Sequence, residues 1–114
     1  MNAKLMALQN KITSNRLLEA IIMQLNKDFY LANVNISFSK KLTLIQLYEK
    51  LENKILDLFK NEYDTYLNLI YRIDVSENKL KKLKVNDIEQ VIKTVTLLVL
   101  EREFQKILLR SKFQ

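Results

Sequence analysis

Apolar residues recur along this chain at intervals of three and four, the spacing that keeps side chains on one face of an α-helix. This pattern predicts helices over residues 15–32, 43–73 and 87–111, preceded by a short amphipathic helix or arm over residues 1–13. We interpret residues 43–73 as one helix of about 30 residues, roughly 45 Å long at 1.5 Å per residue. The main alternative is a kink or short break near Asn61.

The segment from Asn86 to Arg110 differs from the others because its apolar residues point in almost every direction once it is wound as a helix. Such a helix must be covered on more than one side, so it is either the central helix of a bundle or half of a subunit interface. Asn86 and Glu89 have the spacing of a capping box, and Asp87 suits the positive end of the helix dipole. The β-branched run over residues 91–99 would also fit a buried strand, but both flanks favour a helix.

Residues 33–39 show the only alternation with a period of two, the pattern typical of a β-strand. Val34, Ile36 and Phe38 lie on one side of this segment and polar residues lie on the other. A lone strand needs a pairing partner. We therefore expect an extended connection whose three apolar side chains plug the end of the bundle, and the alternative is a strand that pairs with a second subunit.

The composition supports an all-helical fold. The chain has 114 residues, enough for one domain with a real core, and it contains no glycine and no proline. Tight hairpins that need positive φ are hard to make without glycine, and uninterrupted helices are favoured. We predict a single domain over residues 1–114 that is all-α, an antiparallel three- to four-helix bundle with one long central helix.

Histidine and cysteine are also absent from the chain. Their absence removes most zinc sites, the Ser-His and Cys-His nucleophile pairs, and the side chain best suited to proton transfer near neutral pH. Without glycine there is no glycine-rich loop of the kind that cradles phosphate groups. We therefore predict a protein that is not an enzyme and that uses no cofactor.

Carboxylates are the remaining groups with chemical potential. Glu101 and Glu103 can in principle meet Asp57 and Glu62 inside a bundle and hold a hard metal ion. Bundle metal sites of that kind normally include Glu-x-x-His pairs, so we expect solvated helix faces or salt bridges instead. Glu62 also lies on an apolar stripe; we expect it at a kink or beside a basic residue, and the alternative is a buried polar group that fixes helix register.

The chain has 19 basic and 13 acidic residues, a net charge of +6 that permits attraction to phosphate, an anionic membrane surface or an acidic protein. Fifteen of the basic residues are lysine, and the compositional drift of an AT-rich coding sequence explains such a surplus equally well. The candidate anion-binding residues are Arg72, Lys79, Lys81, Lys82 and Lys84. They would make salt-dependent, sequence-independent phosphate contacts, and the alternative is a solvated connection.

No segment approaches the roughly 18 apolar residues that a membrane span needs. The first residues also lack the pattern of a secretory signal peptide, because polar residues arrive early and no small-residue cleavage site follows. We therefore expect a cytoplasmic protein without membrane contact.

The last helix and the second half of the 43–73 segment carry more apolar residues than a three-helix bundle can cover. The candidate interface residues are Tyr63, Leu67, Ile70, Leu97, Leu100, Phe104 and Leu108. If they are exposed, they mark a binding surface whose expected partner is a second copy of the chain or another protein. If the N-terminal helix covers them through Leu5, Leu8 and Ile12, the chain is a self-contained four-helix monomer.

Residues 69–77 (LIYRIDVSE), together with residues 101–107 (EREFQKI) and Arg110, resemble a family of small, uncharacterised bacterial helical proteins. The resemblance covers roughly the C-terminal half of the chain and brings no activity with it. The sequence thus leads to two functional expectations. The first is a non-enzymatic protein-interaction or structural module that acts as a homodimer, and the alternative is a nucleic-acid-associated accessory protein that binds phosphate through its lysine patch.

Overall fold

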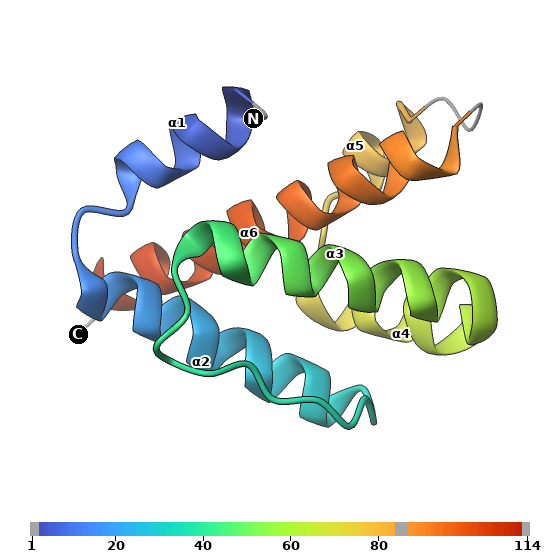
Figure 1. Cartoon of the computed structure of the whole chain (residues 1–114), viewed down its shortest axis with the longest axis horizontal. Helices are drawn as coiled ribbons and strands as arrows, with labels where there is room; N and C mark the ends of the chain where they lie inside the picture. The colour runs from blue at the N-terminus through green and yellow to red at the C-terminus, as the bar shows by residue number, and fades with distance from the viewer. Residues whose placement is uncertain (1–2, 84–86, 113–114) are drawn as a thin grey trace.

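The structure of the chain is a computed structural model that describes residues 3–83 and 87–112. In these ranges the chain forms helices and no strand (Figure 1). The helices are α1 (Ala3–Lys11), α2 (Asn15–Leu31), α3 (Leu44–Asn61), α4 (Tyr63–Ile73), α5 (Glu77–Lys81) and α6 (Ile88–Lys112). The prediction of an all-α bundle is confirmed, and the long helix α6 contacts α1, α2, α3 and α4.

The prediction of one helix over residues 43–73 is wrong, because the chain reverses between α3 and α4. Glu62 ends α3 and precedes α4 with φ −144° and ψ 64°, which is outside the helical region. Figure 1 shows α3 and α4 lying side by side as a helical hairpin with its turn at one end of the molecule. Glu62 is exposed at this turn, in agreement with its expected position at a break and not in the core.

Burial explains why the hairpin replaces a single rod. The molecule measures 38 × 31 × 26 Å, so a straight helix of roughly 45 Å would project beyond it. Folding back places Leu69 and Ile73 of α4 in the same core as α3, where both are fully buried. An aromatic group formed by Phe59, Tyr63 and Tyr66 packs across the turn, with ring centroids 5.2–5.6 Å apart.

The segment between α2 and α3 is an extended connection, as expected, and it lies alongside α2 and not over the end of the bundle (Figure 1). The amide of Asn26 holds it in place, since its Nδ2 donates to the carbonyl of Phe38 at 2.9 Å and its Oδ1 accepts from the Phe38 N–H at 2.7 Å. Val34 and Phe38 are buried, and Ile36 is half-buried. The connection begins at Asn33, whose φ of 62° is a left-handed conformation that asparagine tolerates better than most residues.

Side-chain caps mark several helix starts. Thr43 and Gln46 form the predicted capping box at the start of α3. The capping box expected at Asn86 involves a residue outside the described ranges. Within them, Asp87 Oδ1 accepts a hydrogen bond from the Glu89 N–H at 3.0 Å, which satisfies a backbone donor at the start of α6.

The helix α6 is covered from two sides by its own chain. Ile92, Val95 and Val99 are fully buried in the main core. On another side α1 packs against α6 and buries Leu5 and Leu8, each only 3% exposed. The N-terminal segment therefore provides the cover that the sequence left open. No helix in the described ranges is long and apolar enough to cross a membrane.

Candidate binding groove

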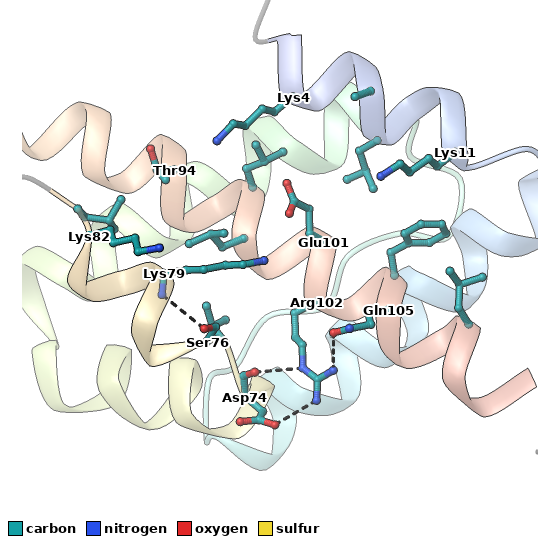
Figure 2. A pocket seen from close by; sticks show the side chains of 18 residues that line it. Lys4, Lys11, Asp74, Ser76, Lys79, Lys82, Thr94, Glu101, Arg102 and Gln105 are labelled. Atoms are coloured by element: carbon teal, nitrogen blue, oxygen red, sulfur yellow. Dashed lines mark hydrogen bonds and ion pairs between the residues drawn. The ribbon is translucent and has the colours of Figure 1, made fainter. Parts of the chain in front are cut away.

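A groove of about 1020 Å³ lies over α6, between α1 on one side and α5 with the preceding turn on the other (Figure 2). Its apolar lining residues are Ala7, Leu8, Val75, Leu83, Leu97, Leu98, Phe104 and Leu108. The α6 residues in the lining extend from Thr94 to Leu108, roughly 21 Å of helix at 1.5 Å per residue. A groove of this size and lining suits an apolar ligand or a short segment of another chain.

Local sequence places the two walls. Ser76 caps α5, because its Oγ accepts a hydrogen bond from the Lys79 N–H at 3.4 Å. Leu80 of the short α5 and Leu83, which follows the helix, are half-buried and pack against the core. The opposite wall is α1, which is anchored on α6 by Leu5 and Leu8.

An arginine clamp fixes the turn between α4 and α5. Arg102 Nε donates to the carbonyl of Asp74 at 3.0 Å, and Arg102 Nη2 donates to Asp74 Oδ2 at 3.1 Å. Arg102 Nη1 also donates to Gln105 Oε1 at 2.8 Å. Asp74 itself has φ 68°, so the clamp stabilises a left-handed residue at the end of α4. The guanidinium of Arg102 is thus already engaged, and it shapes the groove wall (Figure 2).

Lysines surround the groove. Lys4 and Lys11 come from α1, and Lys79 and Lys82 come from α5 and its C-terminal end, so positive charge stands on both walls (Figure 2). Glu101 rises from α6 between them. The four lysines outnumber the acidic residues of the lining, and the groove therefore combines an apolar floor with a positive potential.

The predicted interface residues do not form one exposed patch. Leu97, Leu100 and Ile70 are buried within the chain, at 2%, 0% and 6% exposure. Leu97 nevertheless contributes to the groove floor, together with the half-buried Phe104 and with Leu108, which is 41% exposed. The predicted surface is therefore reduced to one side of the groove floor, because Leu100 and Ile70 are buried within the chain.

Tyr63 and Leu67 belong to a different part of the molecule. Both are exposed on α4, near the turn of the α3–α4 hairpin, and neither lines the groove. The sequence analysis grouped them with the α6 residues because it treated residues 43–73 as one straight helix. The hairpin separates them from the groove.

Of the candidate anion-binding residues, the structure brings two into the groove. Lys79 and Lys82 line it, whereas Lys81 and Arg72 are exposed and do not. Lys84 lies outside the described residues. The sequence analysis missed the two lysines on the opposite wall, Lys4 and Lys11, although their spacing of seven places them on one face of a helix. That spacing was the available signal.

The side of α6 that faces α2 carries a second group of charges, which is buried. Lys106 Nζ lies 2.9 Å from Asp28 Oδ2 on α2 and 3.0 Å from Glu103 Oε1 on α6. Asp28 is 4% exposed and Glu103 is 0% exposed. Gln24 also donates to Asp28, at 3.2 Å, and Arg110 pairs with Gln24 at the edge of this cluster.

One lysine cannot neutralise two buried carboxylates, and the pKa values separate accordingly. Burial and the adjacent Asp28 raise the pKa of Glu103 to about 8, so Glu103 is mainly protonated at neutral pH. Burial opposes the charge on Asp28, but hydrogen bonds from Glu103 and Lys106 outweigh it and hold the pKa of Asp28 below 3.8. The result is one ion pair, Asp28 with Lys106, next to a neutral carboxylic acid.

The sequence analysis expected Glu103 on a solvated face or in a salt bridge. Lys106 lies 3.0 Å from Glu103 Oε1, the distance expected of a salt bridge, but the face is buried and Glu103 is mainly neutral at neutral pH. Neither carboxyl oxygen of Glu103 has a hydrogen-bond partner of good geometry, which adds to the cost of ionising this buried group. Among the described residues no group of three or more acidic side chains is placed to hold a metal ion.

Comparison of this chain with protein-family models, curated proteins and solved structures finds no match. The resemblance of the C-terminal half to small bacterial helical proteins therefore stays a prediction. The function has to be argued from the groove and its surroundings.

Proposed function

We propose that this chain is a non-enzymatic protein-interaction module and that the groove over α6 is its docking site. The observation that carries the proposal is the groove floor, in which Leu98, Phe104 and Leu108 remain partly accessible between two helical walls. Apolar surface that a folded chain leaves open between positive walls is typical of an interaction site. The lack of histidine, cysteine and glycine in the sequence agrees with binding and not with catalysis.

The occupant can be a second copy or a different protein. A second copy would carry the same net charge of +6, which disfavours self-association at a lysine-rich groove. We therefore favour a different protein, while homodimerisation through exposed apolar residues outside the groove stays open to test by light scattering across micromolar concentrations. The cytoplasmic location stays a prediction from the sequence.

A selection experiment tests the docking site and does not require an identified partner. A displayed library of helical peptides is selected for binding to the full chain. The selected peptides are then tested for binding to two variants with a substitution in α6. Leu108→Glu changes a groove residue that is 41% exposed, and Leu109→Glu changes its neighbour, which is 43% exposed and does not line the groove. Both variants should retain their helical circular dichroism spectrum.

We expect Leu108→Glu to weaken binding by about tenfold or more, because a buried leucine contributes about 1.5–3 kcal/mol and 1.4 kcal/mol corresponds to tenfold. Leu109→Glu should leave binding unchanged. If both variants bind equally well, or if no peptide is selected, the groove is not a docking site.

Nucleic-acid binding is the second candidate, favoured by one observation. Lys79, Lys81 and Lys82 are all exposed on or next to α5, where they can reach phosphate groups together. This function predicts duplex binding that weakens steeply with salt and that drops when the three lysines are replaced by glutamine. Absence of duplex binding at low salt would remove this candidate.

A further inference from the structure

The groove has features that select one kind of occupant. Its floor extends along α6 from Thr94 to Leu108, roughly 21 Å, which is the length of about four helical turns. The described residues contain no strand, so there is no sheet edge that could pair with an extended peptide. A helix satisfies its own backbone hydrogen bonds and can bury an apolar face here without help from the groove.

The two walls add a charge pattern to this geometry. Lys4 and Lys11 are two helical turns apart along α1, and on the other wall Lys79 of α5 is three residues before Lys82, the C-cap of that helix (Figure 2). A helix lying on the floor would therefore have lysines along both of its flanks. Acidic residues on those flanks would meet them at the edge of the groove, where charge contributes to orientation and association rate.

We propose that the groove binds an acidic amphipathic helix of a partner protein. Apolar residues of this helix recur at intervals of three and four, and aspartate or glutamate occupies both flanks of the apolar face. This inference rests on the proposed function, and it names the chemistry of the occupant. A second copy fits poorly, because the first helix of this chain, AKLMALQNK, carries two lysines and no acidic residue.

Glu101 gives the proposal a distinctive consequence. It is a carboxylate on α6 within the groove, between the two lysine-bearing walls (Figure 2). An acidic helix would be repelled by it, so removal of this charge should strengthen binding. A neutral occupant would show no such gain.

The experiment uses the full chain and four fluorescently labelled synthetic peptides, each constrained to be helical. Three share one apolar face and differ in their flanks, which are glutamate, glutamine or lysine. The fourth keeps the glutamate flanks and replaces the apolar face with serine. Binding is measured by fluorescence anisotropy at low and high NaCl concentration.

We expect the glutamate-flanked peptide to bind most tightly and its affinity to fall as NaCl is raised, because salt screens exposed charges. Lys11→Gln, Lys79→Gln and Lys82→Gln should each weaken it about two- to fivefold, the range for single exposed ion pairs. Glu101→Gln should strengthen it by a similar factor. Lys27→Gln, which changes an exposed lysine on α2 away from the groove, is the control and should have no effect.

The outcomes separate the two proposals. If the glutamine- and glutamate-flanked peptides bind equally, without salt dependence, the acidic occupant is wrong and the groove still serves as a docking site. If no peptide with the apolar face binds, the docking function itself fails. The proposal of an acidic helix is also wrong if the chain binds duplex DNA more tightly than the peptides and loses this binding in the same lysine variants. It is wrong as well if light scattering shows that a second copy of the chain occupies the groove.

Discussion

The side of α6 that faces α2 and the side that faces α1 are covered to different extents. Towards α2, charged groups are enclosed, and Lys106 lies within 3.0 Å of both Asp28 and Glu103. Towards α1, the surface stays open as a groove, and its lysines surround an apolar floor. The helices that cover these sides differ in length, since α2 has 17 residues and α1 has 9.

This difference shows that cover by a shorter helix leaves part of the apolar surface of α6 accessible. The longer α2 closes its side of α6 so completely that polar groups within it must pair or change protonation state. The shorter α1 buries Leu5 and Leu8 but leaves Phe104 and Leu108 partly accessible. In our proposal, the side that faces α2 contributes stability and the side that faces α1 binds a partner. Three substitutions test this contrast.

The largest effect is expected on the enclosed side. Lys106→Met removes the cation that serves both Asp28 and Glu103, and breaking a buried pair in this way typically costs about 3–5 kcal/mol. Urea unfolding at neutral pH would measure the loss. The matched control is Lys93→Met on the same helix, which breaks an exposed pair with Glu89 at 3.4 Å and should cost less than about 1 kcal/mol. Equal losses in the two variants would mean that the cluster is not effectively buried.

A smaller effect concerns pH. The pKa of Glu103 is raised from 4.5 to about 8, so the folded chain holds a proton that the unfolded chain releases above pH 4.5. Its contribution to stability is full below pH 4.5 and is lost as pH rises through 8. Between pH 6 and 8 the free energy of unfolding should fall by about 2 kcal/mol from this group.

Glu103→Gln checks the origin of this slope. The amide cannot titrate, so the variant should lose the decrease between pH 6 and 8. Asp28 contributes in the opposite direction and at lower pH, because its lowered pKa gives stability that is lost as pH falls below 3.8. Chemical unfolding across pH 5–9 measures the free energy of unfolding of the wild-type protein and of Glu103→Gln. A wild-type profile that is flat, or a slope that persists in Glu103→Gln, would contradict the assignment.

The smallest global effect is expected on the open side. Leu8→Ala should loosen α1 without unfolding the domain, because a nine-residue helix held by few buried side chains can open by itself. We expect a global loss under about 1 kcal/mol, compared with about 2–5 kcal/mol for Leu58→Ala in the main core. Hydrogen exchange should show α1 amides losing protection while α2 amides keep theirs. A loss as large as that of Leu58→Ala would show that α1 is an integral part of the core.

Several features could be predicted from the sequence because they depend on local spacing. The apolar stripes of residues 15–32 and 87–111 correspond closely to α2 and α6. Thr43 and Gln46 form their capping box because both groups belong to one turn of the chain. The alternation over residues 33–39 produced an extended connection with Val34 and Phe38 buried.

The candidate site was predicted only in fragments. Lys79 and Phe104 were both named, but for two different functions, and the groove joins them. Nothing in local spacing connects the N-terminal helix with residues about 90 positions later. The sequence analysis therefore did not recognise Lys11 as a residue of the same groove. The burial of Glu103 was missed for the same reason, since a glutamate on a helix is by default a solvent-facing residue.

The sequence by itself determined that the chain is helical, where α2 and α6 lie, and that α6 requires cover from more than one side. Those properties arise from periodicity and composition, which act over a few residues. Only the tertiary structure decided that residues 43–73 fold back at Glu62, that α1 supplies the second cover, and that a lysine-rimmed groove remains beside it. These outcomes depend on how distant segments share one core, because the reversal and the docking of α1 are stabilised by apolar burial between segments that no local pattern relates.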